Sequence, residues 1–595
     1  MAPVEVLPDR GKFPEKNRKS VAPSATSTVF VFGPFRLDPA EGVLRRSGKP
    51  IHLFPKAVEL LTALVAARGS VVRKEQLLER VWPGTYVQDG TLSKNISFLR
   101  KALGNRRYIE TVSRRGYRFV GTLHEVPAEG QPSQPAVSSL AMLPFHSSDE
   151  KLDYIGEGLT DSLIGLLSRL SDLKVMASST VFQFKGSGVD PRQVARELRV
   201  DAVLCGRLNR HGRWLELAVE LCDKKGTRLW GQTYRRARSE LPAWDRELAR
   251  DVAAALERRW TPAPAHATSS SPKDATAKAY NLYLKGLHEY NKRTPSAILK
   301  SGEYFRRALE ADPHLALAHV GVGMAYSTLS WVWVGTIAPA QVRHTMETAT
   351  SKALELDPAL PEAHVMHGSF LFWHEWKWRD AERALLRAVA LNPQCVMARQ
   401  VYGFLLTALG RLDEAEEQLS AALELDPLSN AININLAWLW YVGGRYDEAI
   451  EMCQETLELE PGFGGAHLVL GLCRERKKQY AQALADLDRA REQIGENSTV
   501  SAVRAFVLGK LKRRAEAAAA LRELEDLSRS RYVSAFIIAL GYCGLGDAEK
   551  IFAWLEKARD ERSFGLLLIN NLPIAESMRS PSLFHEIVRS MGLES

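Results

Sequence analysis

The sequence predicts three folded parts in one chain: an α+β domain that ends in a hairpin, an α/β domain, and an all-α superhelical solenoid. Three observations carry this prediction. A basic amphipathic helix pattern precedes an Arg-rich hairpin pattern between residues 89 and 120, strand and helix patterns alternate from 137 to 258, and proline recurs after Asp, Asn or Glu at intervals of 34 to 45 residues beyond 312. The length of 595 residues also exceeds what one hydrophobic core serves.

Shifts in composition indicate the domain bounds. Residues 127–135 (PAEGQPSQP) and 261–274 (TPAPAHATSSSPKD) are rich in proline and small polar residues, as linkers are. We therefore expect a disordered tail at 1–27, an N-terminal domain at 28–123, a linker at 124–136, a middle domain at 137–258, a second linker at 259–274, and helical repeats with a C-terminal cap at 275–595.

The N-terminal domain is expected to contain strands, then three helices, then a hairpin. Short apolar runs predict strands at 29–37, 43–46 and 50–53, and the spacing of apolar residues predicts helices at 56–67 and 73–81. A turn-rich loop (WPGTYVQDG) leads to a third helix that begins near Thr91 and ends at Gly104. Strands at 108–112 and 117–120 enclose the sequence SRRG, so the hairpin tip is basic.

The third helix has one apolar and one basic face. Leu92, Ile96, Leu99 and Leu103 fall at i, i+4, i+7 and i+11, so they form one stripe that should face the core. The opposite face carries hydroxyl, amide and cationic groups, which bond base edges and phosphates in nucleic acids. The predicted DNA-contacting residues of the helix and hairpin are Thr91, Ser93, Lys94, Asn95, Ser97, Arg100, Lys101, Arg114, Arg115 and Arg118.

The distribution of charge supports double-stranded DNA as the partner of this domain. The whole chain has a formal net charge of +9, and residues 28–123 hold 17 Lys and Arg against 7 Asp and Glu. The remaining 499 residues hold 62 basic and 63 acidic residues, so the positive excess is confined to the N-terminal domain. A concentrated positive charge is what the release of counterions from phosphates requires.

Four motifs of this domain resemble those of OmpR/PhoB-type winged helix-turn-helix regulators: LFPKAVELLTALV, VW at 81–82, ISFLRKALG and YIETVSRRGYRFVG. The resemblance implies that the third helix enters the major groove and that the hairpin, the wing, touches the minor groove. Phosphorylated members tend to carry Gly-x-Gly-Tyr in the wing, whereas this chain has Arg-Arg-Gly-Tyr, which is similar to ToxR/CadC-type one-component regulators. Many relatives have His at the position of Asn95, so no base preference is carried over.

The middle domain is expected to be α/β with a mixed sheet. Strands are predicted at 139–145, 174–177, 201–208, 214–223 and 227–234, and helices at 158–170 and 191–198. The phrases LAMLPF, YIGEGLTDSLIGLLSRL, VARELRVDAVLCGRLNR and LWGQTYRR resemble the TolB N-terminal-like (FlgO-like) domain. Asp161, Glu197 and Asp201 have no recurring His or Lys partner, so we expect no catalytic residues here.

The C-terminal half is expected to be a helical solenoid. Small residues recur between the spaced prolines, for example Gly403, Ala437 and Gly471, and paired helices approach closely where Gly or Ala stands at their crossing. Spacings of 34 and 35 residues are those of tetratricopeptide repeats, which this half resembles. We expect seven to eight units from about 275 to 571 and a capping helix at 581–591. The family implies a concave surface that binds a protein or small-molecule partner.

The sequence favours no metal, cofactor or enzyme assignment. His364, His367 and His374 lie among tryptophans, but no Cys or carboxylate stands at a matching spacing, and a packed repeat core is the favoured interpretation. The aromatic residues Trp331, Trp333, Trp438 and Trp440 are likewise expected to pack between helices rather than line a groove. Six scattered cysteines indicate reduced thiols, and we find no catalytic signature such as a Walker A loop or GxSxG.

These observations predict a one-component transcriptional regulator that binds DNA through its winged helix and senses a signal or partner through its repeats. No window of 18 apolar residues is present, so we expect a cytoplasmic protein without a membrane span. The resemblance also implies a dimer on DNA, because such winged helices commonly bind direct repeats as pairs. The alternative is a scaffold or adaptor whose winged helix binds protein.

Overall fold

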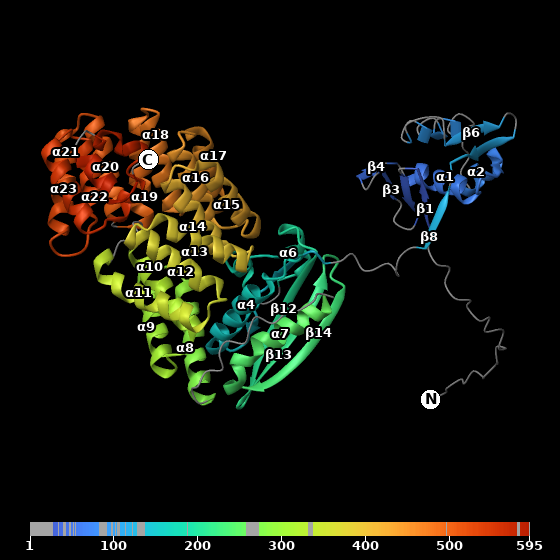
Figure 1. The fold of residues 1–595 in the computed structure, drawn as a ribbon, viewed down its shortest axis with the longest axis horizontal. Coiled ribbons are helices and arrows are strands. Elements are labelled where there is room, and N and C mark those ends of the chain that lie inside the picture. The colour runs from blue at the N-terminus through green and yellow to red at the C-terminus, as the bar shows by residue number, and fades with distance from the viewer. Residues whose placement is uncertain are drawn as a thin grey trace, which may run out of the picture. The chain divides into compact units, whose positions relative to one another are not determined.

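The computed structural model describes residues 28–33, 35–39, 43–46, 49–51, 53, 55–81, 92–93, 95–96, 99–100, 103, 108–112, 115–121, 123–127, 137–186, 189–256, 273–330, 337–495, 497–579 and 583–593. The chain forms two compact units, Met1–Pro135 and Ala136–Ser595 (Figure 1). In the described part of the chain, no helix is both long and apolar enough to cross a membrane.

The first unit contains two antiparallel sheets and helices between them. One sheet has the order β4-β3-β2-β1-β8 and the other has the order β5-β7-β6. The strands are β1 (Thr28–Phe32), β2 (Phe35–Asp38), β3 (Val43–Arg46), β4 (Lys49–Ile51), β5 (Val71–Val72), β6 (Ile109–Val112), β7 (Gly116–Phe119) and β8 (His124–Pro127), and the helices are α1 (Pro55–Ala66) and α2 (Lys74–Val81). The predicted strand at 29–37 is two strands, because Gly33 turns the chain with a φ of +54°.

The core of the first unit confirms the predicted apolar faces. Leu60, Leu61, Leu64 and Val65 of α1 are fully buried, and Leu78 of α2 is partly buried. The aromatic rings of Phe32, Phe35, Tyr108 and Phe119 pack with centroids 4.9 to 6.1 Å apart and join the two sheets.

The second unit begins with a mixed sheet of order β11-β9-β12-β13-β14, in which β10 also pairs with β12. The strands are β9 (Ser139–Met142), β10 (His146–Ser147), β11 (Lys174–Val175), β12 (Ala202–His211), β13 (Trp214–Asp223) and β14 (Arg228–Ala237), and the helices are α4 (Asp153–Leu167), α5 (Ser178–Val181), α6 (Pro191–Glu197) and α7 (Leu241–Ala255). The α/β prediction is confirmed, although α4 begins five residues earlier and ends three residues earlier than the apolar spacing predicted.

The repeats follow as a curved stack of helices (Figure 1). In the described residues they form eight consecutive pairs, which confirms the expected number. The helices are α8 (Lys273–Asn291), α9 (Pro295–Ala311), α10 (Ala316–Ser330), α11 (Pro339–Leu356), α12 (Pro361–Phe370), α13 (Trp378–Leu391), α14 (Val396–Ala408), α15 (Leu412–Leu425), α16 (Asn430–Val442), α17 (Tyr446–Leu459), α18 (Gly464–Arg476), α19 (Tyr480–Ile494), α20 (Ser498–Lys510), α21 (Arg514–Leu527), α22 (Ala535–Cys543) and α23 (Ala548–Asp560), and α24 (Leu583–Ser590) follows them.

Two features recur among the helix pairs. A Cβ on Gly403 would lie 2.8 Å from Leu419, and one on Gly471 would lie 2.8 Å from Leu487, so glycine permits the close crossing that the sequence predicted. The Asx-Pro pairs end the second helices, and the Asx side chain then accepts a hydrogen bond from the backbone two residues later, as Asp357 does from Ala359 at 3.0 Å.

The middle domain and the repeats pack as one body, although the sequence predicted separate domains. Tyr280 and Leu284 of α8 are buried in the core of the middle domain. A Cβ on Gly158 of α4 would lie 2.5 Å from Leu284, so the two helices touch. On the other side of the interface, the Asp426 carboxylate accepts hydrogen bonds from the hydroxyls of Ser179 and Thr180. The turns that mark the repeats therefore also bind the middle domain.

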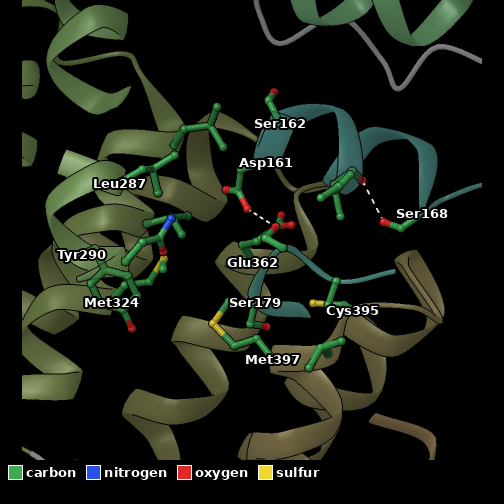
Figure 2. A pocket seen from close by; sticks show the side chains of 18 of the residues that line it. Asp161, Ser162, Ser168, Ser179, Leu287, Tyr290, Met324, Glu362, Cys395 and Met397 are labelled. Atoms are coloured by element: carbon green, nitrogen blue, oxygen red, sulfur yellow. Dashed lines mark hydrogen bonds between the residues drawn. The ribbon is translucent and has the colours of Figure 1, made fainter. Parts of the chain in front are cut away.

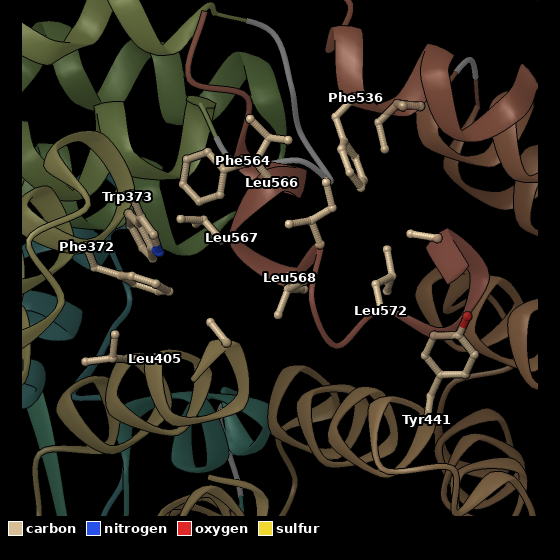
Figure 3. Packing of buried hydrophobic residues seen from close by; sticks show 14 of the residues in the cluster. Phe372, Trp373, Leu405, Tyr441, Phe536, Phe564, Leu566, Leu567, Leu568 and Leu572 are labelled. Carbon is tan, nitrogen blue, oxygen red and sulfur yellow. The ribbon is translucent and has the colours of Figure 1, made fainter. Parts of the chain in front are cut away.

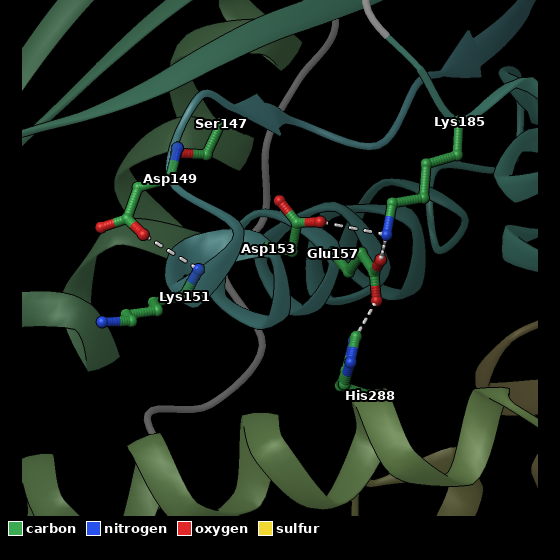
Figure 4. A network of polar contacts seen from close by, with 7 residues as sticks. All are labelled: Ser147, Asp149, Lys151, Asp153, Glu157, Lys185 and His288. Atoms are coloured by element: carbon green, nitrogen blue, oxygen red, sulfur yellow. Dashed lines mark hydrogen bonds and ion pairs between the residues drawn. The ribbon is translucent and has the colours of Figure 1, made fainter.

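A polar network also links the middle domain to the repeats (Figure 4). The Glu157 carboxylate of α4 lies 2.6 Å from Nδ1 of His288 on α8 and 2.6 Å from Nζ of Lys185, which also contacts Asp153 at 3.2 Å. Burial alone would raise the pKa of Glu157, but the hydrogen bonds from His288 and Lys185 outweigh it, so the pKa is lowered. Glu157 is therefore charged near neutral pH and links the two domains.

The chain after the last helix pair folds back over earlier repeats, a feature that the sequence did not predict (Figure 3). The repeats end at Asp560 rather than near 571, and two 3₁₀ segments follow, Phe564–Leu568 and Pro573–Met578. Phe564 packs on Trp373 with centroids 5.2 Å apart, and Asn571 donates to the carbonyl oxygens of Thr407 and Ala408 at 3.2 and 2.8 Å. The last part of the chain thus closes the apolar core of the solenoid.

Candidate nucleic-acid interface

The apolar stripe of the third helix holds it in the core of the first unit. Residues 92–93, 95–96 and 99–100 are helical in the described part of this segment. Leu92, Ile96, Leu99 and Leu103 are at most 3% exposed, which confirms the predicted stripe. Because these four residues occupy one side, the described polar residues between them, Ser93, Asn95 and Arg100, lie on the other side or at its edges.

The polar side of the helix is described at three of the predicted contact positions. Ser93 is exposed, and its hydroxyl lies 3.5 Å from the hydroxyl of Tyr117 in β7. Asn95 and Arg100 are half-buried. Four further predicted contacts of the helix, Thr91, Lys94, Ser97 and Lys101, lie outside the described residues.

Arg100 ties the helix to the hairpin. Its Nε donates to the carbonyl oxygen of Ile109 at 2.9 Å, and its guanidinium also donates to the hydroxyl of Thr111 at 2.8 Å. Both partners belong to β6. Arg100 therefore acts as a positioning residue that sets the hairpin against the helix.

The hairpin tip requires glycine at 116. This residue has a φ of +144°, and a Cβ there would lie 2.0 Å from the carbonyl oxygen of Val72 in β5. The neighbouring Arg115 is exposed, and its N–H donates to the carbonyl oxygen of Val112 at 3.0 Å, which closes the turn. Arg114 lies outside the described residues.

Arg118 lies in β7 and forms an ion pair with Glu110 of β6. The guanidinium donates to one carboxylate oxygen at 2.6 and 3.2 Å, and the two side chains are 41% and 50% exposed. A pair this exposed contributes about 0–1 kcal/mol. A phosphate can therefore replace Glu110 as the partner of Arg118 at small cost.

Sequence reasoning did not single out Tyr117. This residue is 5% exposed, packs in the core of the first unit and brings its hydroxyl to Ser93. The signal available in the sequence was an aromatic residue directly after the hairpin glycine. Successive side chains of a strand point to opposite faces, so this side chain points to the core when the next one points outward.

His374, Trp438 and Trp440, which were among the residues considered as ligands or groove residues, lie in packed surroundings. His374 is 1% exposed and stacks on Phe370, and burial lowers the pKa of its imidazole to about 4. Nε1 of Trp440 donates to Glu416 at 2.9 Å, and Trp438 packs on Tyr441. Across the described residues, no three His, Cys, Asp or Glu side chains are placed to hold a metal ion. Trp331 and Trp333 lie outside the described residues.

Comparison with known families matches segments of all three predicted domains. Residues 48–119 match the family described as "Transcriptional regulatory protein, C terminal", and residues 136–243 match the second domain of HilA/YgeH-like transcriptional regulators. Tetratricopeptide repeat families match residues 377–430, 405–462 and 443–505. The chain carries an OmpR/PhoB-type regulator domain, a HilA-like second domain and tetratricopeptide repeats. The resemblance of the middle domain to TolB N-terminal-like domains stays a prediction.

Three relatives show how widely these parts are shared. The chain is similar to the transcriptional regulator HilA of Salmonella typhimurium, with 27% identity over 413 residues that cover 69% of this chain and 72% of HilA. It is 33% identical over 105 residues to the phosphate regulon regulatory protein PhoB of Escherichia coli, which covers 17% of this chain and 46% of PhoB. It is also 29% identical over 252 residues to putative adenylate cyclase 3 of Rhizobium meliloti, which covers 42% of each chain.

Proposed function

We propose that this chain is a one-component transcriptional regulator that binds duplex DNA through its first unit and receives its signal at the second. The observation that carries the proposal is the confinement of the positive charge to residues 28–123, on a domain whose third helix buries one face completely. The match to regulator domains at 48–119 and 136–243 supports it. In this proposal Arg100 positions the wing and the other nine predicted residues of helix and wing contact bases and phosphates. The chain acts in the compartment that holds the chromosome, the cytoplasm of a bacterium.

A mobility shift on the gene's own upstream region tests the DNA contacts. We expect the double variant Lys94→Ala with Arg115→Ala to weaken binding of the full chain. The slope of log affinity against log salt should become shallower by about 0.9 for each phosphate that the variant no longer neutralises. Arg529→Ala is the matched control, because Arg529 is an exposed arginine in the second unit. Equal affinity and equal salt slope in the double variant and the control would refute this choice of contacts.

A scaffold whose winged helix binds protein is the second candidate. The observation that favours it is the set of tetratricopeptide repeats, a fold that binds peptides and partner proteins. Selection from random duplexes by the full chain separates the two candidates. Enrichment of a motif supports the regulator, and failure to enrich any sequence supports the scaffold.

Three finer points belong to the proposal. We propose that the signal is a protein or a small molecule bound at the repeats, that the chain pairs on DNA as a dimer, and that it has no enzymatic activity of its own. The partial likeness to a putative adenylate cyclase covers 42% of the chain, so an assay for cyclic AMP formation by the purified protein tests the last point directly.

A further inference from the structure

A large cavity lies within the second unit, between the middle domain and the first repeats (Figure 2). Its volume is about 1390 Å³, and its walls come from α4, α5 and α7 of the middle domain and from α8, α10, α12, α14 and α16 of the repeats. Tyr283, Tyr290, Met324 and Phe404 are among the apolar and aromatic residues that form most of the wall. Pockets that hold small ligands are commonly about 300–1000 Å³, so this cavity has room for a ligand and for water.

Among the acidic side chains that line the cavity, three come from helices in distant parts of the sequence. They are Asp161 of α4, Asp245 of α7 and Glu362 of α12. Figure 2 shows the side chains of Asp161 and Glu362 directed to the same region of the cavity. The two residues belong to different domains and meet because the repeats pack against the middle domain.

Two of these carboxyl groups have an oxygen without a partner. Asp245 is 6% exposed, and its Oδ2 accepts hydrogen bonds from Ser162 at 2.6 Å and from Tyr280, whereas its Oδ1 has none. Oε2 of Glu362 is likewise buried and without a hydrogen bond. Buried polar atoms in proteins are nearly always bonded, so two unsatisfied oxygens in one cavity indicate that a hydrogen-bond donor binds there.

The charge inside the cavity is unbalanced. Burial raises the pKa of all three carboxyl groups, that of Asp245 to about 6, and the proximity of Asp161 adds to the rise at Glu362. Arg293, Arg246 and Arg169 line the described wall, and each lowers the pKa of one of these carboxyl groups, but burial outweighs all three. Arg293 and Arg246 are exposed, and Arg169 is partly buried with an Nε that makes no hydrogen bond. An occupant with a positive charge would relieve this excess.

We propose that the cavity binds a small organic amine with an apolar body, with its ammonium group between Asp161 and Glu362. A metal ion fits less well, because the described residues hold no group of three metal-binding side chains. The tyrosines of α8 provide aromatic faces, which attract organic cations. The apolar body lies along Met324 and Phe404.

Such a ligand would contact both domains at once and would hold them together. Asp161 belongs to the middle domain and Glu362 to the repeats, so a bound ammonium group links the two. The role of this ligand as a signal rests on the proposed function, whereas its binding to the cavity does not depend on that function. Binding is therefore measured on the full chain without DNA, so that its failure can be told apart from a failure to bind DNA.

The test uses three probes that share an indole ring and differ in charge: tryptamine, tryptophol and indole-3-acetate. By calorimetry at pH 7.5 we expect tryptamine to bind at least tenfold more tightly than the neutral and the anionic probe. We also expect weaker binding of tryptamine at pH 5.5, where more of the carboxyl groups are protonated. Equal binding of the three probes, or no binding of tryptamine, overturns the proposal.

Two variants locate the site. Asp161→Asn and Glu362→Gln are each expected to weaken tryptamine binding at least tenfold, whereas Glu310→Gln, an exposed carboxylate of α9, leaves it unchanged. Without ligand, both cavity variants should unfold at the same or a higher temperature than the parent, because each removes a carboxyl group whose burial was unfavourable. Variants that stay folded and bind tryptamine as the parent does place the ligand elsewhere and refute the site.

Discussion

One glutamine joins the repeats to the middle domain, and its removal gives the sharpest test of their packing. Gln394 lies in the turn before α14. Its Nε2 donates to the carbonyl oxygens of Ser168, Leu170 and Leu173 at 3.0, 3.2 and 2.7 Å, and its Oε1 accepts from the backbone N–H of Val175 at 2.8 Å. A single side chain thus serves four backbone groups that follow α4.

The Gln394→Ala variant removes all four hydrogen bonds. A buried backbone group without a partner costs about 1–3 kcal/mol. Water from the adjacent cavity can reach some of the carbonyl oxygens, so we expect a total loss of about 2–4 kcal/mol rather than the full sum. Gln394→Glu should be at least as damaging, because a carboxylate would face three carbonyl oxygens and could accept but not donate.

Native-state hydrogen exchange is the assay, because unfolding of a chain with several domains is not a single two-state transition. A loss of about 2 kcal/mol corresponds to exchange about 30-fold faster at the amide of Val175. Gln341→Ala, an exposed glutamine of α11, is the matched control and should leave that amide unchanged. If Gln394→Ala changes the exchange of Val175 by less than threefold, the glutamine does not hold this interface.

Three further predictions concern other contacts. Arg100→Ala should lower the unfolding free energy of the first unit by about 1–2 kcal/mol, since two hydrogen bonds to the hairpin are removed; an unchanged denaturation midpoint would contradict this. Glu157 has a lowered pKa, so it stabilises the fold above its ordinary value of 4.5 and loses this effect in acid; Glu157→Gln should therefore unfold at a lower temperature at pH 7 and approach the parent below about pH 4. Asp245 has a pKa raised to about 6, so its ionisation destabilises the fold as pH rises from 3.8 to 6; the melting temperature of Asp245→Asn relative to the parent should rise over that range and level off above it, and a flat difference would contradict the raised pKa.

Local patterns were sufficient for most of the secondary structure. The stripe from Leu92 to Leu103 repeats with the helical period, and burial of such a stripe follows whatever the rest of the fold is. The strand at 214–223 and the Asx-Pro ends of the repeats were predicted for the same reason, since alternation and proline act within a few residues. The early start of α4 was not predicted, because glycine at 156 and 158 lowers helix propensity while close packing against Phe145 and Leu284 requires it.

The candidate DNA-binding face was predicted as a set of residues but not as a set of roles. Charge and residue type selected Arg100 and Arg118 together with Arg115. In the structure, Arg100 and Arg118 have partners in β6 that lie nine and eight residues away along the chain. The side chain of Arg115 is exposed on the tip of the wing. Which arginine forms contacts within the protein depends on how the strands pair, and the residue type alone does not reveal it.

By itself, the sequence determined the kinds of domain in this protein, the confinement of positive charge to one of them, and the apolar faces of its helices. Only the tertiary structure decided that the middle domain and the repeats form one body, that the end of the chain returns over earlier repeats, and that Asp161 and Glu362 share a cavity. The physical reason is the separation along the chain over which each effect acts. Periodicity, turns and charge act over a few residues, whereas these contacts join residues as far as 247 positions apart and exist only once the apolar surfaces of α4 and α8 have met.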